Sequence, residues 1–425
     1  MSRLSAVIGI LVFIALAWLI SMDRRRFPLR QVIGALILQW VLALLILKTE
    51  VGRRVFEGLA WAVTRLLHFS DAGAGFLFGP LVDDNQSWGF LFAFRVLPTI
   101  IFFSSLTTIG YHLGILQKAV GLMAAIMRRS LRISGAEALC AAANMFTGQT
   151  EAPLTIRPYI APMTRSELFN IMAVGFATVS GSAMAAYLII LGKADAAHQV
   201  LFAKHLLAAS VMSAPAGVMM AKIILPETAV PQTAGTSRLR VEPHTINVVD
   251  AAATGATDGL KLALNVGAML IAFIAIITML DAGLGQIGRL PGISDALAAA
   301  GVKTLSLKGM LGTIFWPIAF LIGIPTPDCH AFGSLLGEAM AANEFVAYIS
   351  LADMIRQGQI SERTTQMACY ALCGFANFAS IAIQIAGIGG MAPDRRHELA
   401  GFGLRAMAAG ALACWSTGAI AGLLI

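Results

Sequence analysis

The chain has 425 residues, of which 58% are hydrophobic and 12% are charged. A soluble globular domain carries about 25% charged residues, so the composition excludes that class and indicates a protein that crosses a membrane many times. The net charge of +7 does not indicate nucleic-acid binding, because the basic residues cluster in short loops between apolar segments. The five cysteines form no CxxC pair, which predicts buried free thiols and no zinc site.

Runs of about 20 apolar residues predict membrane helices. The first run lacks a small-residue cleavage site, so it is interpreted as a membrane helix and not as a signal peptide. Segment 50–67 is apolar on one side and basic on the other, which predicts a helix along the membrane interface. The predicted membrane helices are 4–21, 31–48, 90–115, 167–191, 198–224, 258–281, 345–356 together with 364–386, and 399–425.

Polar residues interrupt two further apolar segments, 136–163 and 306–342. In the second segment, Asp328 and His330 are interpreted as turn-forming residues at a hairpin end and not as a metal or acid–base pair. Lys261, near the start of a predicted span, is expected to extend its ammonium group to the membrane surface. The least hydrophobic stretch, 226–245, is a predicted solvent loop.

Basic residues in short loops predict the orientation in the membrane. Arg24, Arg25, Arg26 and Arg30 follow the first predicted helix, which places that loop in the cytoplasm and the N-terminus outside. A second basic cluster comes two crossings later, so it is also expected in the cytoplasm, and the two clusters agree. This second cluster comprises Lys118, Arg128, Arg129 and Arg132.

The chain contains an internal repeat. The tripeptide AAN occurs at 142–144 and 341–343, and GFAT at 175–178 is matched by GFAN at 374–377. In both halves, the glycine lies 31 positions after the asparagine. Repeats of this kind are common in transporters, whose binding sites lie where interrupted helices of the two halves meet.

Each half has the same parts. An interrupted segment carries a glutamate, Glu151 or Glu344, and a long apolar helix follows with a small polar stretch inside it, 175–182 or 374–380. Non-helical backbone at membrane depth is tolerated only where it is buried or lines a cavity. The four polar patches are therefore predicted to meet at one site, and an ionisable residue inside the membrane is a functional candidate by default.

Three motifs resemble the concentrative nucleoside transporters: GQTEAP at 148–153, NEFVAY at 343–348 and CGFANFASIAIQIAGIGGMAPDRR at 373–396. They cover roughly residues 90–425 in the order expected for this family. The resemblance implies an all-α homotrimer with eight membrane helices per subunit, two re-entrant hairpins and interfacial helices. It also implies transport of nucleosides such as uridine by an elevator motion, driven by Na⁺ or, in some bacterial members, by H⁺, with no organic cofactor, no catalysis and no nucleic-acid partner.

The resemblance divides the chain into four parts. Residues 1–135 are expected to hold scaffold and interfacial helices, and 136–225 the first transport repeat. Residues 226–300 are expected to hold a loop, an interfacial helix and a scaffold helix, and 301–425 the second transport repeat. The expected location is the inner membrane of a bacterium.

The resemblance also assigns residues to the two ligands. The first hairpin tip faces the nucleobase, Phe375 packs on the base, and polar groups of the second half hold the ribose. The implied substrate residues are Gly148, Gln149, Thr150, Glu151, Ala183, Glu344, Phe375, Asn377 and Ser380. The implied cation residues are Asn144, Ala173, Val174, Thr178 and Val179. One position departs from the family, because Ala339 stands where its members carry a basic residue.

The residue types suit these roles. An amide can both donate to and accept from a base edge, and a carboxylate accepts strong hydrogen bonds from two hydroxyls. Hydroxyl and carbonyl oxygens suit a hard cation such as Na⁺ better than zinc. Alternatives stay open. Glu151 could pair with Arg157 instead of binding a ligand. An intramembrane enzyme and a passive channel are rival functions, and the absence of an HExxH motif speaks against the enzyme.

Overall fold

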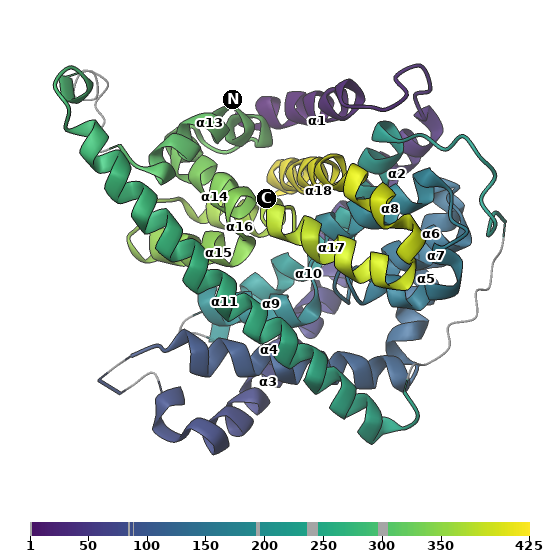
Figure 1. Cartoon of the computed structure of the whole chain (residues 1–425), viewed down its shortest axis with the longest axis horizontal. Coiled ribbons are helices and arrows are strands. Elements are labelled where there is room, and N and C mark those ends of the chain that lie inside the picture. Colours follow the sequence, from purple (N-terminus) through teal and green to yellow (C-terminus); the bar gives the residue numbers. More distant parts are fainter. Residues whose placement is uncertain (1, 84–85, 88, 193–195, 236–244, 296–304) are drawn as a thin grey trace.

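The computed structural model describes all residues except 1, 84–85, 88, 193–195, 236–244 and 296–304. Within these described ranges every regular element is a helix (Figure 1), as the all-α prediction requires. All five cysteines are free and buried, which confirms the prediction of unpaired thiols. The predicted solvent loop contains no helix over 226–235, and its residues 236–244 lie outside the described part.

The N-terminal part supplies α1 to α5. The predicted interfacial helix begins as expected after Thr49, whose hydroxyl accepts a hydrogen bond from Gly52 N at 3.0 Å, but it continues eleven residues beyond the predicted end. The helices here are α1 Ser2–Leu19, α2 Leu29–Lys48, α3 Glu50–Phe78, η1 Gly79–Val82, α4 Phe92–His112 and α5 Ile115–Leu131.

The first repeat forms a hairpin followed by a broken helix. Ser134 and Glu137 form a capping box at the start of α6, and Thr164 and Glu167 form a second one at the start of α8. The helix predicted over 167–191 is interrupted at 178–180, where the small polar residues lie. The elements are α6 Gly135–Ala143, η2 Ala152–Ile156, α7 Arg157–Ile160, α8 Arg165–Ala177, α9 Gly181–Leu191 and α10 Ala196–Ile224.

The second repeat has the same order of parts. Its hairpin consists of α14 and α15, which meet at Asn343, so segment 345–356 is a hairpin arm and not the beginning of a span with 364–386. The second broken helix is interrupted between Ala371 and Phe378. The elements are α13 Leu307–Ile322, η3 Thr326–Asp328, α14 Cys329–Ala341, α15 Glu344–Arg356, α16 Glu362–Ala371, α17 Phe378–Met391, η4 Pro393–Arg395 and α18 Arg396–Leu424.

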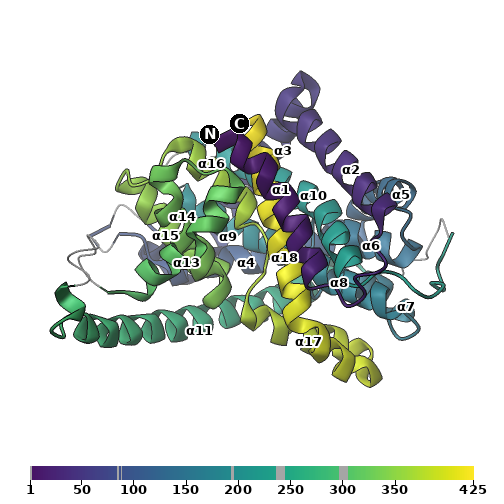
Figure 2. The same cartoon turned by 90° about the horizontal axis from the view of Figure 1, so that it is seen from above.

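Burial separates interior helices from peripheral ones. Six helices of the described residues are long and apolar enough to cross a membrane, and α1, α13 and α17 are shorter apolar helices. In α8–α9, α10 and α18 the apolar window is 94%, 89% and 83% buried, against 17% in α11 Val248–Gly288. Figures 1 and 2 both show α11 running along one face of the molecule. Its outer side is therefore available to lipid or to another subunit.

The two glycines of the duplicated motif lie where the halves touch. A Cβ added at Gly374 would lie 2.2 Å from the carbonyl oxygen of Phe176, and one at Gly175 would lie 2.9 Å from Gln384 Nε2. A side chain at Gly374 would collide with backbone, so this glycine is required for the close approach of the second helix break to the end of α8. The repeat found in the sequence therefore marks the crossing point of the two broken helices.

Polar contacts hold each hairpin. At the base of the first, Lys222 Nζ lies 2.5 Å from Glu137 Oε1, and both side chains are at most 4% exposed. Near the tip of the second, Lys308 at the start of α13 pairs with Glu338, three residues before the end of α14, at 3.4 Å. This pair links α13 to α14 beside Ala339, which itself carries no charge.

Asp328, just before α14, holds the base of the second hairpin. Its carboxylate accepts hydrogen bonds from Ser361 N and Oγ and from Thr364 Oγ1, at 2.6 to 3.1 Å. Burial opposes the charged form, but these hydrogen bonds outweigh it and hold the pKa of Asp328 below its usual range. Asp328 ends the short 3-10 helix η3, whereas His330 lies in the first turn of α14.

Candidate functional site

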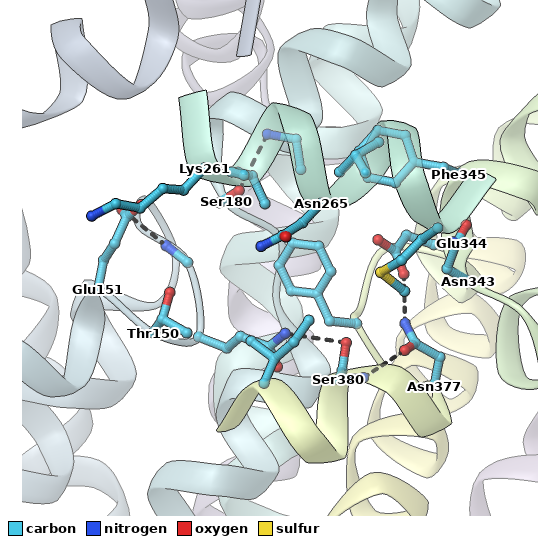
Figure 3. Close-up of a pocket in the computed structure, with 18 of the residues that line it drawn as sticks. Thr150, Glu151, Ser180, Lys261, Asn265, Asn343, Glu344, Phe345, Asn377 and Ser380 are labelled. Atoms are coloured by element: carbon cyan, nitrogen blue, oxygen red, sulfur yellow. Dashed lines mark hydrogen bonds between the residues drawn. The ribbon is translucent and has the colours of Figure 1, made fainter. Parts of the chain in front are cut away.

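A cavity of about 320 Å³ lies where both hairpin tips, both helix breaks and α11 meet. Its size falls in the range of small-molecule pockets. Figure 3 shows side chains from all of these elements pointing into it. All nine substrate residues implied by the motifs line this cavity: Gly148, Gln149, Thr150, Glu151, Ala183, Glu344, Phe375, Asn377 and Ser380.

Hydrogen bonds connect the first hairpin tip to α17. Gln149 donates from Nε2 to Ser380 Oγ at 3.1 Å, and Gln384 donates from Nε2 to Gln149 Oε1 at 2.8 Å. Gln384 also donates to the carbonyl oxygen of Met172 at 3.1 Å. The amide of Gln149 is therefore held in one orientation by a residue that the sequence analysis did not single out. The sequence contained a signal for Gln384, because it lies one turn after Ser380 and these two are the polar residues of an otherwise apolar helix, α17.

The same chain of hydrogen bonds reaches the second hairpin. Ser380 N donates to Asn377 Oδ1 at 2.8 Å, and Asn377 Nδ2 donates to Glu344 Oε2 at 2.7 Å (Figure 3). On the other side, the Tyr187 hydroxyl donates to Glu344 Oε1 at 3.2 Å. Tyr187 stacks on Tyr348 with ring centroids 4.2 Å apart. Each carboxylate oxygen of Glu344 thus has one protein donor and keeps a lone pair for a ligand.

Three helices begin at the cavity, and side chains cap their first turns. Ser180 caps α9, Asn343 caps α15 and Asn377 caps α17, each by accepting from a backbone N–H three residues later, at 2.8 to 3.2 Å. Glu344 is the first residue of α15, where the helix dipole favours negative charge. This position stabilises a carboxylate that is only 4% exposed.

Glu151 lies at the other end of the cavity. Gly148 N donates to its Oε2 at 3.4 Å, and no ion pair with Arg157 is formed among the described residues. Arg157 is exposed and lies beyond the turn, in α7. The structure therefore favours a ligand-facing Glu151 over the alternative in which Arg157 neutralises it.

The remaining walls are apolar except along α11. Phe375, Phe345 and Ala183 line the cavity from the broken helices and the second hairpin. Asp258, Lys261 and Asn265 line it from one face of α11, at positions i, i+3 and i+7. Lys261 borders the cavity and pairs with Asp258 at 3.4 Å, while 70% of its side chain is exposed, so its extension to the membrane surface stays a prediction. The helical spacing of these three residues was the signal.

The implied cation residues lie where the first hairpin tip contacts the first helix break. Gly181 N donates to the carbonyl oxygen of Phe146 at 3.0 Å, which holds the turn after Asn144 against the break. Asn144 is fully buried; its Nδ2 donates to Cys140 O at 3.2 Å, whereas its Oδ1 has no hydrogen-bond partner among the described residues. An unpaired buried oxygen is costly, and a hard cation would satisfy it.

The other four cation positions are also buried at this break. Thr178 donates its hydroxyl hydrogen to the carbonyl oxygen of Val174 at 2.9 Å, which leaves the hydroxyl lone pairs available. The last carbonyls of a helix lack helical donors, so Val174 can offer its oxygen to an ion. Ala173 and Val179 are buried beside it, at 0% and 2% exposure, and can contribute only backbone carbonyls.

Three family models match the chain. The N-terminal model of Na⁺ dependent nucleoside transporters matches residues 8–81, a model described as nucleoside recognition matches 93–194, and the C-terminal model of the same transporters matches 205–422. The chain belongs to the concentrative nucleoside transporter family. The resemblance found in the three sequence motifs is confirmed.

Relatives of this transporter match over the whole length. An uncharacterized transporter of Haemophilus influenzae is 41% identical, covering 100% of this chain and 98% of the relative. The nucleoside permease NupC of Helicobacter pylori is 36% identical, and the match covers 100% of this chain and 98% of the permease.

Solved structures of a related transporter, CNTnw, have the same fold. The inward-facing substrate-bound state is 38% identical and superposes with a TM-score of 0.88, covering 100% of this chain and 98% of that chain. A variant of CNTnw in an outward-facing state superposes with a TM-score of 0.90 over the same shares. This transporter is accordingly a multi-pass membrane protein, and its family acts on nucleosides.

Proposed function

We propose that this transporter is a Na⁺-coupled symporter that concentrates nucleosides in the cytoplasm. The observation that supports it best is the continuous chain of hydrogen bonds from Gln384 and Gln149 through Ser380 and Asn377 to Glu344. It joins both hairpins and one broken helix around a single cavity. A neutral solute with hydrogen-bonding groups at both ends suits such a site.

The two ends of the cavity suit the two parts of a nucleoside. Gln149, Thr150 and Glu151 offer donors and acceptors for a base edge, while Phe375 offers an apolar face. At the other end, Glu344 and Asn377 offer acceptors for the vicinal hydroxyls of ribose, because charge-assisted hydrogen bonds are about twice as strong as neutral ones.

Sodium would bind Asn144 Oδ1, the Thr178 hydroxyl and the carbonyl oxygens of Ala173, Val174 and Val179. A bound ion there bridges the first hairpin to the first broken helix and so stabilises the hairpin tip that contacts the substrate. One ion is sufficient energetically, since a charge moving through ~100 mV releases about 2.3 kcal/mol. A tenfold gradient adds about 1.4 kcal/mol, and together these concentrate a neutral solute a few hundredfold.

In the membrane, we propose eight crossings: α1, α2, α4, α8–α9, α10, α11, α16–α17 and α18. The hairpins α6–α7 and α14–α15 then enter from opposite sides and stop partway. The Ser21 hydroxyl donates to Ile223 O at 2.8 Å and Arg395 donates to Met163 O at 2.8 Å. The Ser166 hydroxyl, just after the loop that follows α7, donates to Leu225 O, just after the end of α10, at 2.7 Å. Together these contacts gather the loops after α1, α7, α10 and α17 at one end, which supports a cytoplasmic location for this end and an outside N-terminus.

The proposed motion is an elevator in a homotrimer of the bacterial inner membrane. The hairpins and broken helices would move together with the substrate, and α4 and α11 would belong to the fixed scaffold. The low burial of α2, α4 and α11, at 33%, 28% and 17% of their apolar windows, supports contacts of these helices with other subunits or lipid.

Nucleoside uptake into proteoliposomes tests the proposal. We expect uptake of labelled uridine that needs an inward Na⁺ gradient. Other nucleosides should inhibit this uptake, and free nucleobases should not. Asn144→Ala should raise the Na⁺ concentration needed for half-maximal uptake at least tenfold, while the protein remains trimeric by light scattering. Uptake that ignores Na⁺ and stops when the proton gradient is dissipated would assign H⁺ as the coupling ion.

A further inference from the structure

A second, smaller cavity adjoins the main one. This side chamber, of about 140 Å³, is lined by Tyr111 and Thr108 of α4, Thr147 of the first hairpin tip and Thr254 of α11. Glu151 and Asp258 line both cavities, so the two spaces meet between them. The side chamber lies at the end of the molecule where α4 ends and α11 begins.

The side chamber is polar. Thr108 and Thr147 donate their hydroxyl hydrogens to carbonyl oxygens of their own turns, at 3.0 Å each, so their lone pairs remain as acceptors. The Tyr111 hydroxyl lies beside Thr147 and has no hydrogen bond of normal geometry within the described part of the chain, although it is buried. A free donor among several acceptors, next to two carboxylates, matches the edge of a nucleobase.

Size and position also favour the base. The side chamber has less than half the volume of the main cavity, so it accommodates one ring and not a whole nucleoside. It opens beside Glu151, at the end of the main cavity that offers base-edge partners. The base therefore leads when a nucleoside leaves the main cavity in this direction.

We propose that the side chamber is a transient second site for the nucleobase, which binds there while the nucleoside passes between the main cavity and the cytoplasm. The inference rests on the proposed transport function and adds a route to it. Tyr111 donates to the base, and the threonine hydroxyls accept from it. The side chamber therefore lowers the barrier for release without contributing to equilibrium affinity at the main cavity.

Removal of the Tyr111 hydroxyl tests the polar role. We expect Tyr111→Phe to bind uridine at equilibrium within about twofold of the wild type, and to slow both uptake at saturating uridine and release of bound uridine about fivefold, the size of one net hydrogen bond. Tyr159→Phe is the matched control, because Tyr159 belongs to α7 and does not line either cavity. Equal loss of binding and uptake in Tyr111→Phe would place the hydroxyl in the main site and overturn the proposal.

A blocked side chamber tests the route. All native cysteines are buried, so a hydrophilic methanethiosulfonate should react selectively with Thr254→Cys, whose position is exposed. We expect modification to reduce uptake more than tenfold and to leave equilibrium binding intact. Unchanged uptake after complete modification, confirmed by mass spectrometry, refutes the route. A wild type that binds no uridine and takes none up would instead refute the proposed function itself.

Discussion

The carboxylate of Glu344 offers the sharpest test of the site. In Glu344→Gln, the amide oxygen can still accept from Asn377 Nδ2 and the new NH₂ group can donate to the Tyr187 oxygen, so the surrounding side chains stay in place. What is lost is the negative charge and one acceptor that face the ligand. The substitution therefore separates ligand recognition from folding.

The magnitude follows from the hydrogen bonds at stake. Hydrogen bonds to a charged group contribute about 1.5–3 kcal/mol each, and a ribose diol would make two of them. Their loss weakens binding by about 3 kcal/mol, which is on the order of 100-fold in Kd. The wild type should also prefer uridine over 2′-deoxyuridine, and this preference should nearly vanish in the variant.

Equilibrium binding of labelled uridine and 2′-deoxyuridine to the purified protein measures both effects. Glu338→Gln is the control, since Glu338 is a buried carboxylate of the same hairpin that pairs with Lys308 outside the cavity. It should bind both ligands like the wild type. Wild-type affinity and an unchanged preference in Glu344→Gln would refute the assignment of Glu344 to the ribose.

Three further predictions test neighbouring parts of the structure. Gly175→Ala should keep its thermal stability but bind uridine about fivefold more weakly, because the new Cβ displaces Gln384 Nε2 and breaks its hydrogen bond to Gln149. An affinity for uridine equal to that of the wild type would contradict this. Tyr187→Phe should reduce uridine affinity several-fold and lower the preference over 2′-deoxyuridine, since Glu344 loses one orienting donor; a loss of affinity that is equal for both ligands would argue for a purely structural role. Asp328→Asn should lower the Tm in detergent at pH 7, and the difference from the wild type should shrink below about pH 4. The sign follows because a depressed pKa in the folded state stabilises the protein above the unfolded pKa, and this contribution disappears as pH falls through the folded pKa. A Tm difference that stays constant from pH 7 to pH 3 would show that the charge of Asp328 is not what stabilises the hairpin.

Much of the site was readable from the sequence because the environment is so apolar. In a chain with 12% charged residues, polar groups such as Gln149, Glu151 and Glu344 stand out, and their cost inside a membrane implies a role. The equal spacing of the duplicated motifs then indicated that two halves share one site. The same reasoning predicted the helix interruptions, since small polar residues weaken helices and their free carbonyls need a buried setting.

Boundaries were less predictable. The apolar pattern predicts that 345–356 joins the following helix, because both segments are apolar and nothing in the pattern marks a hairpin arm. The structure separates them, since α15 ends at Arg356 and Ser361 caps a new helix, α16. A cap is a local feature, but the direction in which the chain continues after it depends on the packing of α16 against α10 and α18.

Which side chains meet was decided by the tertiary structure alone. Composition and spacing determined that this protein is a multi-pass helical bundle with two related halves and a polar centre. They could not show that Gln384 orients Gln149, that Tyr187 donates to Glu344, or that α11 contributes Asp258 and Lys261 to the cavity wall. These residues are separated by up to 235 positions, and only the crossing of α8, α9, α11 and α17 brings their hydrogen-bonding groups within reach of one another.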